Sequence, residues 1–121
     1  MNAFLRYATV GAAATAAHWT LLALLVEAAG VLPWIASGAG AVLGAQVAFF
    51  ANRRYTFGHA GALAPAWARF MGTAALGAVL GMVVVALGTA SGLHYLFAQA
   101  LATALMLGLT FLINRGWTFA P

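Results

Sequence analysis

The sequence predicts an all-α integral membrane protein: four transmembrane helices form two helical hairpins that repeat in parallel, and both termini are cytoplasmic. Three observations lead to this prediction. The chain is 65% hydrophobic and only 5% charged, whereas soluble domains carry about 25% charged residues. The apolar residues gather in four runs that are separated by three breaks. The first and third breaks are short, and neither of them contains an Arg.

Each apolar run is close to the roughly 20 residues that a helix needs to cross about 30 Å of hydrocarbon. The breaks after the first and third runs, "AGVLP" and "SGLH", are short and rich in turn formers, which predicts that each flanking pair of helices is a hairpin. The middle break, from Asn52 to Arg69, is longer and polar, and we expect a loop there. The expected helices cover residues 8–29, 34–51, 70–90 and 95–113.

The Arg residues indicate the orientation in the membrane. All five fall before the first expected helix, in the middle break or after the fourth helix, and the chain has no Lys. Basic residues mark the cytoplasmic side, so both termini and the middle break are expected there. The single acid, Glu27, is expected near the opposite face. A cleavable secretory leader is not favoured, because the apolar run continues past the Ala-rich segment and Arg6 has a counterpart in the second half.

The composition also excludes several function classes. The absence of Cys removes thiol nucleophiles, disulfides and thiolate metal sites. A single acid excludes hydrolysis by two carboxylates and an oxygen cage for hard cations, and the absence of Lys excludes a Walker A loop. We therefore expect no enzyme activity, metal or cofactor. A net charge of +4 would suggest nucleic acid in a soluble protein, but here the Arg residues belong against the bilayer, so no nucleic-acid partner is expected.

The two halves of the chain repeat one another. "FFANRRYTF" from Phe49 recurs as "FLINRGWTF" from Phe111, and "RYATVG" from Arg6 aligns with "RFMGTA" from Arg69. Because each half starts and ends on the same side, a pseudo-two-fold axis along the membrane normal would relate the halves. The sequence thus predicts one domain over residues 1–121, with repeat halves at about 1–57 and 64–121.

Small residues recur at a spacing of four in the last three expected helices. Lipid tails give no net hydrophobic force between apolar helices, so such residues favour close helix packing. The spacing fits packing within the bundle and also a contact between copies in a homo-oligomer, and both alternatives stay open. The residues are Ala36, Gly40, Gly44 and Ala48, then Gly77 and Gly81, and finally Ala100, Ala104 and Gly108.

The repeated Asn-Arg motif has a topological and a chemical interpretation. In the first, Asn ends the helix, Arg anchors it among lipid head groups, and the aromatic residues form an interfacial belt. Lys would anchor equally well, yet this chain uses Arg alone, whose planar guanidinium can hold a phosphate through two hydrogen bonds. We predict phosphate binding in addition to anchoring. Arg53 and Arg115 are the equivalent pair, whereas Arg54 faces Gly116 in the alignment and is an outer contact or an anchor.

Among the polar residues inside the apolar runs, Gln46, His18 and Glu27 are candidates for a role of their own. Gln46 precedes Arg53 by two helical turns on nearly the same face, so it extends a polar track from Arg53 or else bonds a neighbouring helix. His18 is expected near mid-depth, where a polar residue is a functional candidate or is bonded across a helix interface. Glu27 is either solvated or binds a ligand at the outer face.

The four short helices, the Arg-aromatic hairpin starts and the repeated "NRRYTF" and "NRGWTF" endings resemble the GtrA-like family of small bacterial membrane proteins. The resemblance implies binding of a polyprenyl-phosphate-linked sugar and its flipping across the inner membrane for cell-surface polysaccharide or glycan synthesis. Tyr55 stands where the family more usually has Trp. The implied phosphate and sugar ligands are Arg53, Arg115, Arg54, Asn52, Asn114, Arg6 and Arg69, with sugar or polar-track contacts from Tyr55, Trp117, Gln46 and His18.

Two other functions remain as alternatives. One is a non-transporting anchor or subunit that presents polyprenyl phosphate to a glycosyltransferase, which requires the same Arg cluster. The other is a small drug/proton exporter, which is less favoured. Such exporters depend on a Glu embedded in the first helix, where this chain has His18, and some insert in both orientations.

Overall fold

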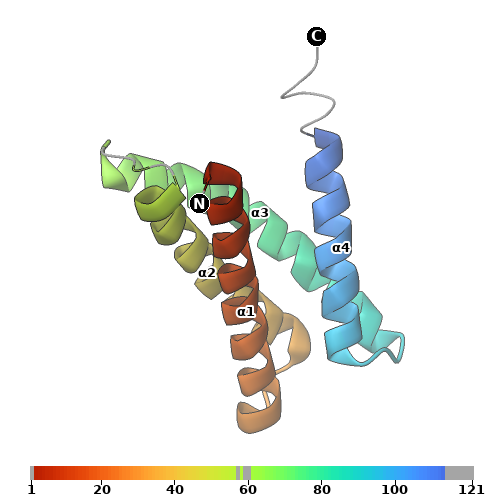
Figure 1. Cartoon of the computed structure of the whole chain (residues 1–121). Helices are drawn as coiled ribbons and strands as arrows, with labels where there is room; N and C mark the ends of the chain where they lie inside the picture. Colours follow the sequence, from red (N-terminus) through yellow and green to blue (C-terminus); the bar gives the residue numbers. More distant parts are fainter. Residues whose placement is uncertain (1, 57, 59–60, 114–121) are drawn as a thin grey trace.

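The prediction of an all-helical chain is confirmed by the computed structural model, which describes residues 2–56, 58 and 61–113 (Figure 1). No strand occurs in these ranges. Four α-helices follow one another, and the second continues directly into a short π-helix, η1. The elements are α1 (Ala3–Ala29), α2 (Pro33–Ala51), η1 (Asn52–Thr56), α3 (Leu63–Ala90) and α4 (Tyr95–Ile113).

The two hairpin turns form where the sequence places its turn formers. Helix α1 ends at Gly30, whose φ of 67° lies in the left-handed region that glycine adopts without strain. Pro33 then begins α2, at a position that needs no backbone N–H donor. Between α3 and α4 the reversal uses Gly92, with a φ of 93°. At its other end α1 is capped by Asn2, whose Oδ1 accepts from the Leu5 N–H at 2.9 Å.

The expectation of a loop from Asn52 to Arg69 was wrong over most of its length. Asn52 has right-handed helical φ and ψ of −66° and −40°, so it does not end the helix, and the helical path runs on to Thr56. Helix α3 then starts at Leu63, so Arg69 lies inside it. The physical reason is local: no Gly or Pro interrupts residues 52–57, and Pro65 falls in the first turn of α3, where a missing N–H breaks no helical bond.

Length and apolar composition identify the chain as a membrane protein. Among the described residues, Phe4–Ala29, Pro33–Thr56 and Leu63–Ala90 are long and apolar enough to cross a bilayer, and α4 contributes a shorter apolar stretch, Tyr95–Leu109. Many large apolar side chains face outward, including Leu76, Leu87 and Phe97, each 65% exposed. Such a surface suits lipid rather than water.

Helices that follow one another in the chain make the main contacts, and α1 and α2 pack most closely. Gly40 permits this approach, because a Cβ built on it would lie 2.5 Å from the backbone oxygen of His18. A Cβ on Gly44 would lie 3.0 Å from the Ala14 oxygen. The small residues of α2 therefore serve packing within the bundle.

The small residues of α3 and α4 behave differently. A Cβ on Gly81 would meet nothing within 4 Å, and on Gly77 it would meet only the Met106 Cε at 3.6 Å. In α4, Ala100, Ala104 and Gly108 are exposed. The expectation of close packing thus holds for α2 but not for these glycines of α3 or the stripe on α4.

We call the two ends of the bundle the turn end, at residues 30–32 and 91–94, and the arginine end, at the start of α1, η1 and the start of α3. Helix α3 crosses obliquely from the turn beside α4 to the arginine end beside α2 (Figure 1). The buried residues concentrate toward the turn end. Leu22, Ala36 and Tyr95 bring α1, α2 and α4 into one cluster there. A second cluster joins α3 to α4 through Val85, Ala98 and Ala102.

Candidate functional site

Three cavities follow one another along the bundle, and we call them together the groove. The outer cavity, about 620 Å³, opens at the arginine end between α1, α2, η1 and α3. The middle cavity, an open hollow of about 310 Å³ on the side of the bundle, shares Thr15 and Ala48 with it. The deep cavity, about 270 Å³, is lined by all four α-helices and shares His18 and Ala41 with the middle one. Ala41 lies about 18 Å along the helix from Arg53, at about 1.5 Å per residue, so the groove spans more than half of the hydrocarbon thickness.

The outer cavity is mainly apolar, and its one charged and one amide side chain among the described residues come from η1. Phe49 and Phe70 form part of its wall, their ring centroids 5.4 Å apart, and Leu107 contributes from α4. Asn52 and Arg53 line the same cavity from the end of the second helical path. An apolar cavity with a cation at its mouth suits an amphipathic ligand that carries a negative group and an apolar chain.

Arg53 stands at the junction of two concave surfaces. It lines the outer cavity and also an open concavity of about 600 Å³ that includes Arg54 and Phe50. Its Nη2 donates to the backbone oxygen of Gly61 at 2.7 Å, which fixes the direction of the guanidinium. Arg53 can therefore contact a group that sits between the apolar interior and the polar surface.

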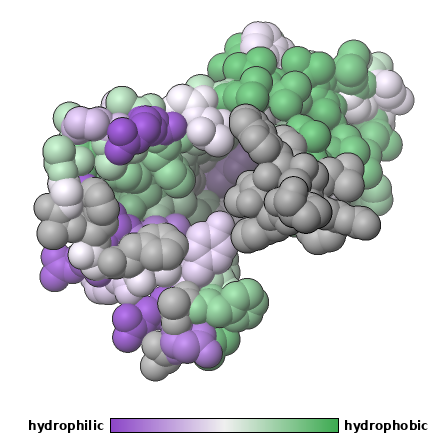
Figure 2. All heavy atoms as spheres, turned by 90° about the horizontal axis from the view of Figure 1, so that it is seen from above, coloured by the Kyte–Doolittle hydropathy of each residue, from purple (hydrophilic) through white to green (hydrophobic). Residues whose placement is uncertain are grey.

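The other described arginines hold the arginine end together or face outward. Arg6 donates from Nη1 to the backbone oxygen of Tyr55 at 3.3 Å, at the C-terminal end of η1, where a cation is favourable. The Arg54 guanidinium lies 5.6 Å from the centroid of the Tyr55 ring. Arg69 is exposed on α3. Seen from this end, polar residues gather over η1 and the start of α1, and apolar residues cover the side of α3 and α4 (Figure 2).

Asn52 has a structural role in η1. Its Oδ1 accepts from the Thr56 hydroxyl at 2.7 Å, so the first and last residues of η1 are joined by a hydrogen bond. π-helical turns are uncommon and occur frequently at functional sites. Here the turn carries Arg53 and Arg54.

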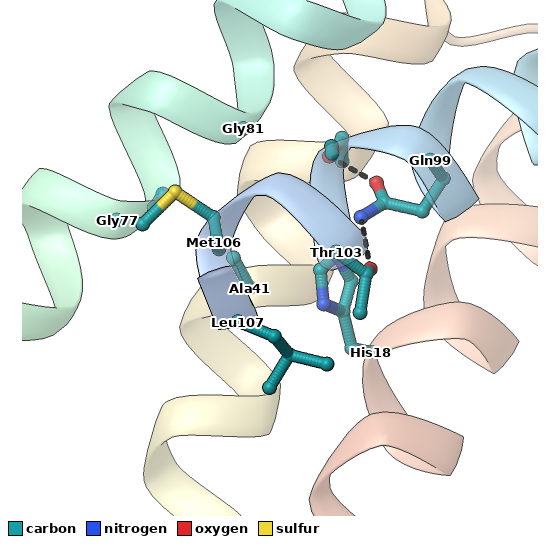
Figure 3. A pocket seen from close by; sticks show the side chains of 11 residues that line it. His18, Ala41, Gly77, Gly81, Gln99, Thr103, Met106 and Leu107 are labelled. Atoms are coloured by element: carbon teal, nitrogen blue, oxygen red, sulfur yellow. Dashed lines mark hydrogen bonds between the residues drawn. The ribbon is translucent and has the colours of Figure 1, made fainter. Parts of the chain in front are cut away.

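The deep cavity holds a cluster of uncharged polar side chains, with Gln99, Thr103 and His18 on one side and Gly77 and Gly81 on the other (Figure 3). Ser37 donates from Oγ to the Gln99 Oε1 at 2.5 Å, and the Gln99 Nε2 donates to the Thr103 Oγ1 at 3.3 Å. Ser37 and Gln99 are 2% and 3% exposed. The Nε2 atom of His18 is buried and has no hydrogen-bond partner within the described part of the chain.

His18 lies in the interior and lines the deep cavity, and of the two alternatives for Gln46 the structure has the bond to a neighbouring helix rather than the polar track. Gln46 accepts from the Trp67 Nε1 at 2.9 Å and contacts the Met71 Sδ from Nε2 at 3.1 Å, so it bonds α3, the alternative left open above. Asn114, Arg115 and Trp117 lie outside the described residues.

Ser37, Gln99 and Thr103 were not predicted as site residues from the sequence. Gln99 and Thr103 are polar, four residues apart and hence on one face of an otherwise apolar helix, which is a signal that the sequence does contain. Ser37 carries no comparable signal, because a lone Ser among small residues in a membrane helix is ordinary.

In the described part of the chain, the three cavities of the groove have no lining residue in the two turns at residues 30–32 and 91–94. There the buried Tyr95 donates from its hydroxyl to the exposed Glu27 Oε1 at 2.9 Å and so joins α4 to α1. Leu22 and Ala36 fill the space beneath this bond. Within the described residues, the helices are therefore packed together at the turn end and leave an open cavity at the arginine end.

Comparison with known families agrees with the resemblance found in the sequence. The family model described as "GtrA/DPMS, transmembrane domain" matches residues 6–119. No curated protein and no solved structure matched the chain.

Proposed function

The chain belongs to the GtrA/DPMS transmembrane domain family, and on this premise we propose that it binds a polyprenyl-phosphate-linked sugar and flips it across the bacterial inner membrane. The family associates the chain with sugars on lipid carriers. The observation that carries the specific proposal is the groove, which leads from Arg53 at one end of the bundle to a buried polar cluster deep inside it.

Each part of such a lipid finds a suitable surface. The phosphate would sit at Arg53, whose guanidinium can bind two of its oxygens. The prenyl chain would enter the apolar outer cavity beside Phe49 and Phe70. The sugar would start in the open concavity that Arg53 shares with Arg54. Arg6, Arg69 and Asn52 would add positive charge and donors around the same mouth.

The proposed topology has four spans, with the arginine end in the cytoplasm. Helix α4 has 19 residues from Tyr95 to Ile113, which is within the range for a span. Both termini and η1 would then lie on the side that basic residues favour. In this arrangement Arg115, Asn114 and Trp117 would complete the mouth from the second repeat, opposite Arg53.

Flipping requires a second state. The groove ends at the closed turn end, so release on the far side needs the contact between α1 and α4 to open while the arginine end closes. A bound lipid shifts this equilibrium only by the difference in its affinity for the two states. No ATP-binding motif is present in the sequence, so net movement would follow consumption of the lipid on the far side.

The proposal is tested with purified protein in liposomes that contain a polyprenyl-phosphate hexose. The rate at which inner-leaflet sugar becomes accessible to an impermeant oxidant is measured for the wild type, Arg53→Ala and Arg53→Lys. We expect fast exposure in the wild type, loss in Arg53→Ala, and only partial recovery in Arg53→Lys, because Lys keeps the charge but not the planar fork. Equal rates in protein-free liposomes and in wild-type liposomes would refute flipping.

The open concavity at the arginine end supports a second candidate function, the presentation of polyprenyl phosphate to a glycosyltransferase. The concavity with Arg53 and Arg54 opens outward at the arginine end, where an enzyme can reach a bound headgroup. A chain that only presents polyprenyl phosphate to a glycosyltransferase would bind the lipid through Arg53 and yet expose no inner-leaflet sugar. The liposome measurement, combined with lipid binding, separates the two functions.

A further inference from the structure

We propose that the deep cavity is a second binding site, which takes the uncharged, hydroxyl-bearing sugar ring of the lipid while it is inside the membrane. The inference rests on the proposed lipid ligand and assigns it a second site, far from the phosphate contact. The site is formed by His18, Ser37, Gln99 and Thr103.

The first argument is the chemistry of the lining. The cluster offers hydroxyl, amide and imidazole groups and no charged side chain among the residues that line it. These groups both donate and accept hydrogen bonds, which matches hydroxyls rather than a phosphate. The His18 imidazole interacts with the backbone of Ser37, but its buried Nε2 makes no hydrogen bond of good geometry among the described residues, and leaving such an atom unpaired is costly inside a bundle. A sugar hydroxyl would satisfy it.

Helix packing does not require glycine at the wall of the deep cavity. Gly81 and Gly77 lie on the wall opposite Gln99 (Figure 3). A Cβ on Gly81 would contact nothing within 4 Å, in contrast to Gly40, where it would collide with His18. Larger residues at position 81 would therefore fit the fold and fill the cavity. We infer that glycine there keeps room for a ligand.

The third argument is size. The cavity volume of about 270 Å³ lies just below the range of about 300–1,000 Å³ for small-molecule pockets. This is room for a single sugar ring and not for a longer glycan. The sugar would enter first, and the phosphate would trail toward the arginine end through the middle cavity.

A hydrogen-bonded Ser37–Gln99 pair also has a purely structural explanation, because such pairs join membrane helices. The two explanations differ in what a filled cavity would do. If the cluster only joins helices, a side chain at position 81 is harmless. If it binds sugar, the same side chain displaces the ligand.

The test uses the full chain in lipid nanodiscs and a farnesyl-phosphate glucose that carries a photoreactive diazirine on its sugar ring. After illumination, labelled peptides are mapped by mass spectrometry in the wild type, Gly81→Leu and Thr103→Val. The control is Gly72→Leu, on the same helix, where a Cβ also meets nothing within 4 Å and which does not line the cavity. We expect label on the segment around Gln99 and Thr103 in the wild type and in Gly72→Leu.

In Gly81→Leu this label should fall by about tenfold, equivalent to about 1.4 kcal/mol, while label near Arg53 persists. Thr103→Val, which leaves the bundle packing in place, should lower it by a smaller factor. Unchanged label in both variants, or no label at Gln99–Thr103 in the wild type, would overturn the inference. Transport without label in the deep cavity would refute this site but leave the proposed function intact. Label in the deep cavity without transport would support this site and refute flipping.

Discussion

The turn end and the arginine end are built from the same apolar residue types, yet one is closed and the other open. At the turn end, Leu22 and Ala36 are fully buried and a hydrogen bond joins Tyr95 to Glu27. At the arginine end, an apolar cavity of about 620 Å³ lies beside Arg53. In a bundle without a hydrophobic force between its helices, small differences in packing and in polar bonds decide which end opens.

The largest effect is expected from locking the turn end. The chain has no Cys, so the double substitution Glu27→Cys, Tyr95→Cys introduces the only two thiols. A short bifunctional maleimide that joins them should abolish flipping, because the groove then has no far-side exit. Binding of farnesyl phosphate at the arginine end should persist. The same variant before cross-linking is the control, and undiminished flipping after complete cross-linking would contradict the comparison.

Removing Arg53 should weaken lipid binding at the open end by about 10- to 100-fold. A hydrogen bond to a charged group contributes about 1.5–3 kcal/mol, and among the described arginines it is the Arg53 guanidinium that lines the outer cavity. Binding of farnesyl phosphate is measured by native mass spectrometry in Arg53→Ala. Arg54→Ala, in which the lost group lies outside that cavity, should have a smaller effect; the reverse order would show that the phosphate sits elsewhere.

One chemical change at two positions compares tight and open packing directly. Gly40→Ala places a Cβ 2.5 Å from the His18 backbone oxygen, and such overpacking costs about 1–3 kcal/mol. Gly81→Ala meets open space and should be neutral or slightly stabilising, since Ala favours helices. Melting temperatures of the purified variants in detergent test the contrast. A lower melting temperature for Gly81→Ala than for Gly40→Ala would contradict the assignment of tight packing to Gly40 and of open space to Gly81.

The smallest effect is expected from Tyr95→Phe, which removes only the hydroxyl that bonds Glu27. The loss should be about 1 kcal/mol, the typical net value of one hydrogen bond, and it should fall on the closed end. Thermal stability should decrease slightly, and farnesyl phosphate binding at Arg53 should not change. A fall in that binding comparable to the fall in Arg53→Ala would mean that the two ends are not separate.

Much of the candidate site followed from the sequence, but not its arrangement. Arg53 and Asn52 were singled out by the repeated motif and His18 by its place inside an apolar run, and each of them lines the groove. For Gln46 the spacing left open a polar track from Arg53 and a bond to a neighbouring helix. Its true partners, Trp67 and Met71, lie on another helix, and spacing along one helix cannot reveal how the next helix is rotated.

The sequence by itself determined that this is an all-helical membrane protein with two short hairpin turns and with Arg6, Arg53, Arg54 and Arg69 toward one end, because bilayer thickness and the scarcity of charge leave few alternatives. Only the tertiary structure decided that the glycines of α2 pack while Gly81 lines a cavity, that Ser37 and Gln99 meet, and that the turn end is closed. The reason is that apolar side chains are interchangeable in lipid, so the choice between contact and open space depends on the rotation and crossing of the helices rather than on the residue types.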